Sequence, residues 1–165
     1  MKTTFRPVLL AILLPVIATV QAATSTTTFE VTATVSPGCV ISATNHDFGI
    51  YTPSSLADNI NGTNVITATC TLSTLYDIGL DAGIGTGATV ASRRMTRTGG
   101  TETLEYSLHQ TADRLVVLGN TLGVDVISAI GTGLAVDHTV FGKIPAGQNA
   151  PAGTYVDTVT ATITF

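Results

Sequence analysis

The final eleven residues of the chain, 155–165, alternate between two faces. One face carries Tyr155, Asp157, Val159, Ala161, Ile163 and Phe165, and the other carries one valine and four threonines. A period of two with many β-branched and aromatic residues predicts a single β-strand over 155–165. Because the sequence ends there, we expect no later segment to pair with the outer edge of this strand. An apolar edge of that kind tends to pair with another chain.

The first 22 residues have the pattern of a secretory signal peptide. Lys2 and Arg6 give a positive start, residues 8–20 form an apolar stretch, and Ala22 provides a small residue for cleavage. The apolar stretch is short and is interrupted by Pro15, which argues against an uncleaved membrane anchor. We therefore expect residues 1–22 to be removed and the mature chain to be exported.

Charge and composition exclude some classes of partner. The chain has seven Lys and Arg, of which five remain after cleavage, against eleven Asp and Glu, so the mature net charge is 5 − 11 = −6. This balance argues against binding nucleic acid or anionic lipid. Charged residues make up only 11% of the chain, which suits a secreted β protein whose surface is covered by neighbouring molecules.

Cys39 and Cys70 are the two cysteines of the chain. In an exported protein an even number of cysteines predicts a disulfide, and two cysteines allow one pairing. A metal site built on the two thiolates would need two further ligands. Since only His46 lies near either cysteine in the sequence, we expect a disulfide and no metal.

Short runs typical of strands recur along the chain, separated by Gly, Pro, Asn and Asp. The predicted strands cover 29–35, 39–43, 65–72, 77–81, 104–109, 115–118, 139–141 and 155–165. No long amphipathic helix is evident, and the stretch 123–136 gives no clear pattern. Many short strands without helices predict an all-β sandwich or barrel in one domain.

Candidate catalytic residues do not form a recognisable constellation. His46, His109 and His138 are scattered, with no pair at the spacing of metal ligands. Asp77 and Asp81 share one face of a predicted strand, but strand ends are often acidic. We therefore predict no enzymatic activity, no catalytic residue, no metal and no cofactor.

The one basic cluster consists of Arg93, Arg94 and Arg97. We interpret it as a solvated strand edge or as a patch for ion pairs between subunits, since isolated surface charges of this kind contribute little to stability. No strand is predicted over these residues.

A polar segment, 23–28, follows the signal, and we expect it to be mobile because it has nothing to bury. Next, Phe29, Val31, Ala33 and Val35 lie on one face of an alternating run. Two interpretations stay open from the residues alone. The first and last strands complete one sandwich, or the sandwich lacks a strand that another copy supplies. Burying the four side chains gives roughly 5–8 kcal/mol, and ordering about eight residues costs about as much or more.

Several motifs resemble the spore coat protein U domain family, which includes the Csu-type subunits of archaic chaperone–usher pili. The matching pieces span nearly the whole mature chain, with one departure at Leu118-Gly119, where Trp-Gly is expected. They are the alternating segment before Cys39, the runs 48–51, 69–71, 76–83, 94–95 and 104–108, and above all 142–148 with 151–158.

The resemblance implies an incomplete immunoglobulin-like β-sandwich of the pilin type that lacks its last strand. It divides the chain into a signal peptide (1–22), a donor-strand segment (23–36) and a pilin domain (37–165). In such families a periplasmic chaperone first fills the gap, and at an outer-membrane usher the next subunit replaces it. Carried over by position, Phe29, Val31, Ala33 and Val35 are donor residues, and the acceptor groove and chaperone contact are Val159, Ala161, Ile163 and Phe165.

The implied function is that of a structural subunit of an extracellular pilus, polymerised by donor-strand exchange and supporting surface attachment and biofilm formation. The implied partners are other pilin subunits, the chaperone and the usher. The alternative is a soluble secreted β-sandwich that binds a ligand or coats a surface.

Overall fold

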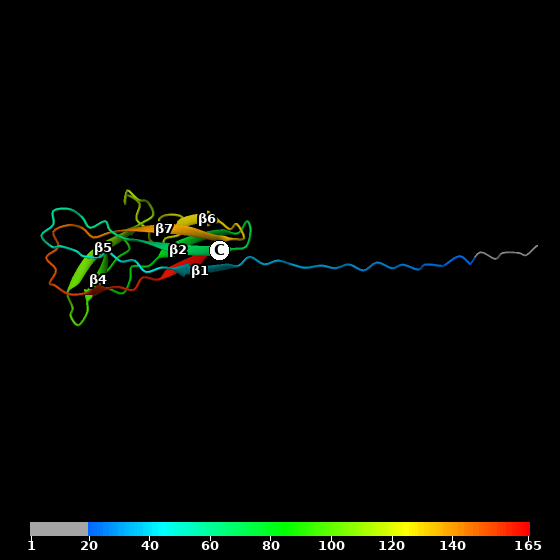
Figure 1. Cartoon of the computed structure of the whole chain (residues 1–165), viewed down its shortest axis with the longest axis horizontal. Coiled ribbons are helices and arrows are strands. Elements are labelled where there is room, and N and C mark those ends of the chain that lie inside the picture. The colour runs from blue at the N-terminus through cyan, green and yellow to red at the C-terminus, as the bar shows by residue number, and fades with distance from the viewer. Residues whose placement is uncertain (1–19) are drawn as a thin grey trace, which may run out of the picture. The chain divides into compact units, whose positions relative to one another are not determined.

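The computed structural model describes residues 20–165, of which Val35–Phe165 form the folded unit (Figure 1). The described part contains nine strands and no helix, so none is present there that is long and apolar enough to cross a membrane. The strands are β1 (Cys39–Ala43), β2 (Thr63–Cys70), β3 (Leu75–Leu80), β4 (Arg93–Arg97), β5 (Thr103–His109), β6 (Ile127–Ile130), β7 (Ala135–Lys143), β8 (Tyr155–Val156) and β9 (Ala161–Thr164).

The strands form two sheets in which every pairing is antiparallel. The larger sheet has six strands in the order β1-β2-β7-β5-β4-β8, and the smaller has three in the order β6-β3-β9. The larger sheet curls, and the two sheets enclose one core between them. The prediction of an all-β sandwich of the pilin type is confirmed.

Side chains from both sheets fill the core. Ile66, Val140 and Ile78 are fully buried, and Leu104, Tyr106 and Leu108 lie on the inner face of β5 as their alternation predicts. Leu118, at the position where the resemblance expects Trp, is also fully buried. The smaller side chain therefore fits the core of this chain.

The predicted disulfide is present. Cys39 on β1 and Cys70 on β2 are directly opposite each other in the ladder, with their Cα atoms 4.1 Å apart. The bond ties the first strand of the sandwich to its neighbour.

Most predicted strands are confirmed to within a few residues, but three differences have physical causes. Segment 115–118 makes only an isolated bridge, between Val117 and His109, because Leu115 and Val116 face solvent. Strand β4 is not predicted, because its three arginines mask the alternation of a strand. Strand β6 is not predicted either, because the stretch between Gly123 and Val136 is rich in Gly and small residues.

The predicted single strand over 155–165 is wrong, because the chain changes sheets in its middle. β8 pairs with β4 in the larger sheet, whereas β9 pairs with β3 in the smaller one. The switch occurs at 157–160, where the carboxylates of Asp157 and Asp81 accept backbone hydrogen bonds from Thr158 and Thr160 in place of a ladder. The alternation itself is confirmed, since odd positions from 155 to 163 are half-buried and even positions are exposed.

The interpretation of the basic cluster is wrong for Arg93. Its side chain is 0% exposed, and its guanidinium donates to four backbone carbonyls, those of Leu80, Asp81, Val90 and Leu118. Its position on an inward face of β4 accounts for the difference. Arg97 does pair at the surface, with Glu102 at 2.8 Å.

Residues 20–34 form no strand, and every side chain among them is exposed. The strand predicted over 29–35 is therefore not formed within a single chain, because no neighbour supplies its backbone hydrogen bonds. Of the predicted signal peptide, residues 1–19 lie outside the described part of the chain.

Candidate functional site

The most prominent feature for function is a gap between the beginning and the end of the folded unit. β1 is an edge strand of the larger sheet, and β9 is an edge strand of the smaller one. Some Cα atoms of the two strands lie within 8 Å of each other, yet no ladder joins them (Figure 1). We call the space between residues 39–53 and 150–165 the terminal-strand gap.

Both walls of the terminal-strand gap are apolar and only half-covered. Ile41 on β1 and Val159, Ala161 and Ile163 near the C-terminus pack against the core without being fully buried. Elsewhere the core side chains of β2, β3 and β5 are buried. The incomplete cover therefore concentrates where the two edge strands face each other, and their outer backbone groups lack a ladder partner there.

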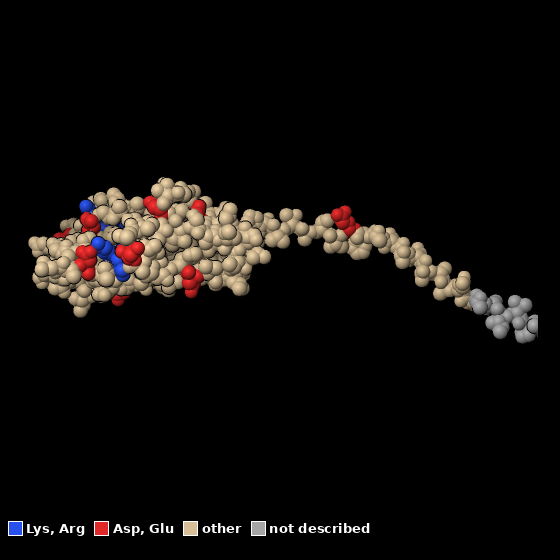
Figure 2. All heavy atoms as spheres, turned by 90° about the horizontal axis from the view of Figure 1, so that it is seen from above, with Lys and Arg blue, Asp and Glu red and all other residues tan. Residues whose placement is uncertain are grey.

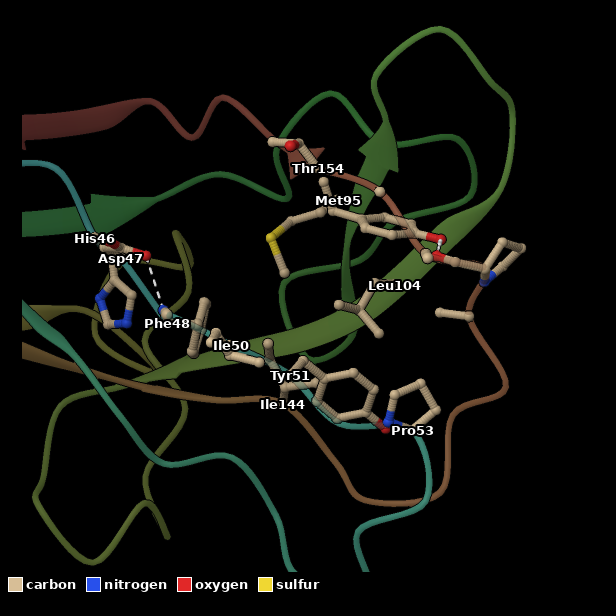
Figure 3. A pocket seen from close by; sticks show the side chains of 16 residues that line it. His46, Asp47, Phe48, Ile50, Tyr51, Pro53, Met95, Leu104, Ile144 and Thr154 are labelled. Carbon is tan, nitrogen blue, oxygen red and sulfur yellow. Dashed lines mark hydrogen bonds between the residues drawn. The ribbon is translucent and has the colours of Figure 1, made fainter.

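A cavity of about 520 Å³ extends the gap beyond the strands (Figure 3). On one side it is lined by the loop that follows β1, and on the other by the segment before β8. Met95 of β4, Leu104 of β5 and the ring of Tyr51 point toward its centre (Figure 3). Its lining residues are His46, Asp47, Phe48, Gly49, Ile50, Tyr51, Pro53, Met95, Leu104, Ile144, Ala150, Pro151, Ala152, Gly153, Thr154 and Tyr155.

Two polar side chains hold the loop wall of this cavity. The hydroxyl of Tyr51 donates to the carbonyl of Pro145 at 3.1 Å and accepts from the amide of Gln148 at 2.8 Å. The His46 ring lies 4.4 Å from that of Phe48, and its Nδ1 lies 3.2 Å from Oδ1 of Asn64. Burial lowers the pKa of His46 below its usual value, so the neutral ring is favoured.

The structure brings some of the predicted site residues together. Val159, Ala161 and Ile163 lie along one wall of the gap, on its inner face. Phe165 departs from the alternation and is 57% exposed at the end of the wall.

The predicted donor residues Phe29, Val31, Ala33 and Val35 are all exposed, with no apolar neighbour covering them.

Sequence reasoning missed the opposite wall. Ile41, Phe48 and Tyr51 line the gap. The sequence predicts only a strand for the segment of Ile41 and a family motif for the segment of Phe48 and Tyr51. The available signal was the position of 48–51 shortly after the first strand of the sandwich, which places it beside the edge that lacks a partner.

The other histidines and Asp77 each contact a neighbouring polar side chain. His138 lies 2.9 Å from the hydroxyl of Tyr76, and His109 lies 2.9 Å from that of Ser107. Asp77 accepts a hydrogen bond from Ser128. Within residues 20–165 no three His, Cys, Asp or Glu side chains are grouped so as to hold a metal ion.

An antiparallel sandwich with an open gap between its first and last strands is the fold of a pilin. A model of the Spore Coat Protein U domain matches residues 25–162, and the chain belongs to this family. The chain is also 38% identical to Protein U of Myxococcus xanthus over 176 aligned positions, which cover 99% of this chain and 98% of that protein. The resemblance inferred from the motifs is confirmed.

Among solved structures, the chain resembles one from the chaperone–tip adhesion subunit pre-assembly complex CsuC–CsuE, from the archaic chaperone–usher Csu pili of Acinetobacter baumannii. The identity is 25% and the TM-score 0.58, over 80% of this chain and 40% of that one. The chain thus spans less than half the length of this solved relative. Together the comparisons place the chain in the Spore Coat Protein U domain family and relate its fold to that of a subunit of a chaperone–usher pilus.

Proposed function

We propose that this chain is a structural pilus subunit that polymerises by donor-strand exchange. The segment 23–36 of one copy lies in the terminal-strand gap of another, so 37–165 acts as the pilin domain. One observation carries the proposal: in each copy two apolar edge strands, β1 and β9, face each other without a ladder, and a separate alternating segment is exposed. Phe29, Val31, Ala33 and Val35 are the donor residues, and Val159, Ala161 and Ile163 line the acceptor wall.

The geometry requires a modest opening of the gap. A strand placed between β1 and β9 lies about 4.8 Å from each of them, so the two edges stand about 9–10 Å apart in the complex. Their Cα atoms now come within 8 Å in places. The inserted strand compensates for this movement, because it forms hydrogen bonds on both sides and covers the half-exposed wall.

The same gap accounts for the other proposed partners. A subunit with an unfilled gap exposes apolar surface in the periplasm, and a chaperone strand that fills it prevents aggregation. The solved relative is a chaperone–subunit complex, which supports this step. Phe165 contacts the chaperone. Assembly then takes place at an outer-membrane usher, and the exported fibre supports attachment and biofilm formation.

A second candidate is a secreted surface-coat protein that acts without a fibre. The description of the family, Spore Coat Protein U domain, favours this candidate, and the chain is 38% identical to Protein U over nearly the full length of both chains. The two functions differ in one property: a coat protein of this kind is stable as an isolated monomer.

The test compares the mature chain with a variant that carries a copy of residues 23–35 fused after Phe165. We expect the mature chain to form oligomers that resist SDS without heating, and the fused variant to be a monomer of higher thermal stability. Val31→Asp should abolish the oligomers, because it places a charge on the inward face of the donor. Thr32→Asp is the matched control, on the outward face. A mature chain that is a stable monomer contradicts the proposal.

A further inference from the structure

Three segments meet at the end of the sandwich where the folded unit begins, which we call the entry end. The carbonyl of Gly38 accepts hydrogen bonds from the amide of Thr71, at 2.9 Å, and from its hydroxyl. The loops 71–74 and 131–134 are joined through the amide of Ser73 and the carbonyl of Gly131, 2.8 Å apart. Gly38, immediately before β1, is therefore held against the loop 71–74.

The entry end is largely apolar, with Asp77 of β3 as a charged residue beside it. Leu72 and Leu134 project from its two loops and are largely exposed. Beside them, Leu75 and Ile130 are directly paired across β3 and β6, and with Phe165 they line a second cavity of about 450 Å³. No charged residue occurs in 71–76 or 127–136. In Figure 2 the charged side chains of the folded unit gather instead over the end that holds β4 and β5.

The opposite end of the sandwich, which we call the far end, also exposes apolar side chains. It is formed by the loops 49–57 and 145–153, which are joined through the hydroxyl of Tyr51. Ile50 is 88% exposed and Leu56 is 100% exposed. Residues 49–57 contain no charge, although the Asp58–Lys143 ion pair and the charged side chains near β4 and β5 lie at this same end.

Strand direction places these two ends against each other in a polymer. β9 runs toward the entry end, because Thr164 is opposite Asp77 near the start of β3. β1 and β9 run in opposite directions, so a strand between them is antiparallel to only one of the two. We expect the antiparallel ladder to form with β9, whose inner face carries the alternating wall of Val159, Ala161 and Ile163. Such a strand enters its acceptor at the acceptor's entry end and leaves at the acceptor's far end.

Chain length then brings the two domains into contact. Three residues lie between Val35 and Cys39, so their Cα atoms are four steps apart, and an extended chain spans at most about 3.5 Å per step. A donor strand whose last inward residue is Val35 thus leaves about 14 Å at most before its own β1 begins. The entry end of the donor copy cannot move away from the far end of its acceptor.

We propose, on the basis of the donor-strand function above, that successive copies pack end to end through a second interface. Leu72 and Leu134 at the entry end of one copy lie against Ile50 and Leu56 at the far end of the copy that holds its N-terminal segment. The partner is another copy of this chain, bound head to tail. A contact of this kind does not close on itself, so it sets the angle between neighbouring subunits along the fibre.

Cross-linking tests this interface separately from strand exchange. Leu56→Cys is combined in one chain with Leu134→Cys or Leu72→Cys, and the SDS-resistant oligomers are treated with a short bismaleimide. We expect a ladder of covalent multimers that survives heating. Leu56→Cys with Val124→Cys is the control, because Val124 is 76% exposed but lies on the loop after Leu118. This pair should give no ladder above background.

The outcomes separate the two proposals. SDS-resistant oligomers without a ladder from either pair overturn the end-to-end interface and leave donor-strand exchange intact. Cross-linking of the single variant Leu134→Cys to itself also overturns it, because the entry ends then meet each other. If no SDS-resistant oligomer forms in the unsubstituted chain, the proposed function fails, and the interface fails with it.

Discussion

The hydroxyl of Tyr106 on β5 donates a 2.7 Å hydrogen bond to Oδ2 of Asp157, the residue at which the last part of the chain leaves one sheet for the other. Oδ1 of the same carboxylate accepts from the amides of Ile84 and Thr158. Gly83 approaches this carboxylate so closely that a Cβ would collide with Oδ2, and its φ of 76° also favours glycine. One side chain therefore fixes the crossover between β8 and β9.

Removing this carboxylate should destabilise the fold more than removing the phenol. Tyr106→Phe loses one hydrogen bond, and we expect a loss of about 1–1.5 kcal/mol in the free energy of unfolding. Asp157→Ala also leaves the buried Tyr106 hydroxyl and two amides without their acceptor, and we expect about 2–4 kcal/mol. Urea denaturation measures both. Thr162→Val, on the exposed face of β9, is the control, and equal losses for Tyr106→Phe and Asp157→Ala would contradict this account.

Arg93 should be among the most sensitive positions of the core. Burial lowers the pKa of its guanidinium, an effect opposed by Tyr106 and by the carboxylates of Asp81 and Asp157. The charge is nevertheless retained, because Arg is protonated throughout the accessible range. Arg93→Met fills similar space but leaves four carbonyls without a donor, and we expect a loss of at least about 3 kcal/mol.

Arg94→Met provides the comparison for Arg93→Met on the same strand. Arg94 is half-exposed, and the one hydrogen bond of its side chain, to the carbonyl of Thr86, is long at 3.3 Å. Its substitution should change stability by less than about 0.5 kcal/mol. Similar losses for the two variants would show that the four carbonyls do not depend on Arg93.

Asp157 and Arg93 also show how far the sequence could predict the fold. The faces of 155–164 were predictable because a period of two is a property of the strand backbone. The crossover was not, because the partners of Asp157 are 51 and 73 residues away in the sequence. The burial of Arg93 was not predictable, because it depends on carbonyls from other segments of the chain, around Leu80, Val90 and Leu118.

One wall of the candidate site was also predictable from the sequence, and the other was not. Val159, Ala161 and Ile163 were predictable as a wall because they alternate next to an edge. The opposite wall required knowing that β1 and β9 lie close together, although they belong to different sheets and are not paired.

The disulfide should stabilise the fold by limiting the unfolded chain. It joins residues 31 apart in sequence, for which loop closure predicts about 3–4 kcal/mol. The double variant Cys39→Ser, Cys70→Ser should lower the denaturation midpoint accordingly, and dithiothreitol should have the same effect on the unsubstituted chain but none on the variant. A reductant that leaves the midpoint of the unsubstituted chain unchanged would contradict this prediction.

Acid should destabilise the folded unit in two steps. Burial lowers the pKa values of His46, His109 and His138 below the usual 6.5. The unfolded chain then binds protons that the folded chain does not, so stability is complete above about pH 7 and falls as the pH drops through 6.5. Glu102, whose pKa is lowered to about 2 by its hydrogen bond with Arg97, loses its contribution at lower pH, from about pH 4.5 downward.

Thermal melting of the folded unit between pH 8 and pH 3 measures both steps. His46→Gln keeps a hydrogen-bonding side chain beside Asn64 but does not titrate, so it should reduce the fall in melting temperature between pH 7 and pH 5. Glu102→Gln should leave that first step unchanged and reduce the second, because the carboxylate no longer needs to be protonated. A melting temperature that rises from pH 7 to pH 5 would require histidines with raised pKa values, which is the opposite of what their burial predicts.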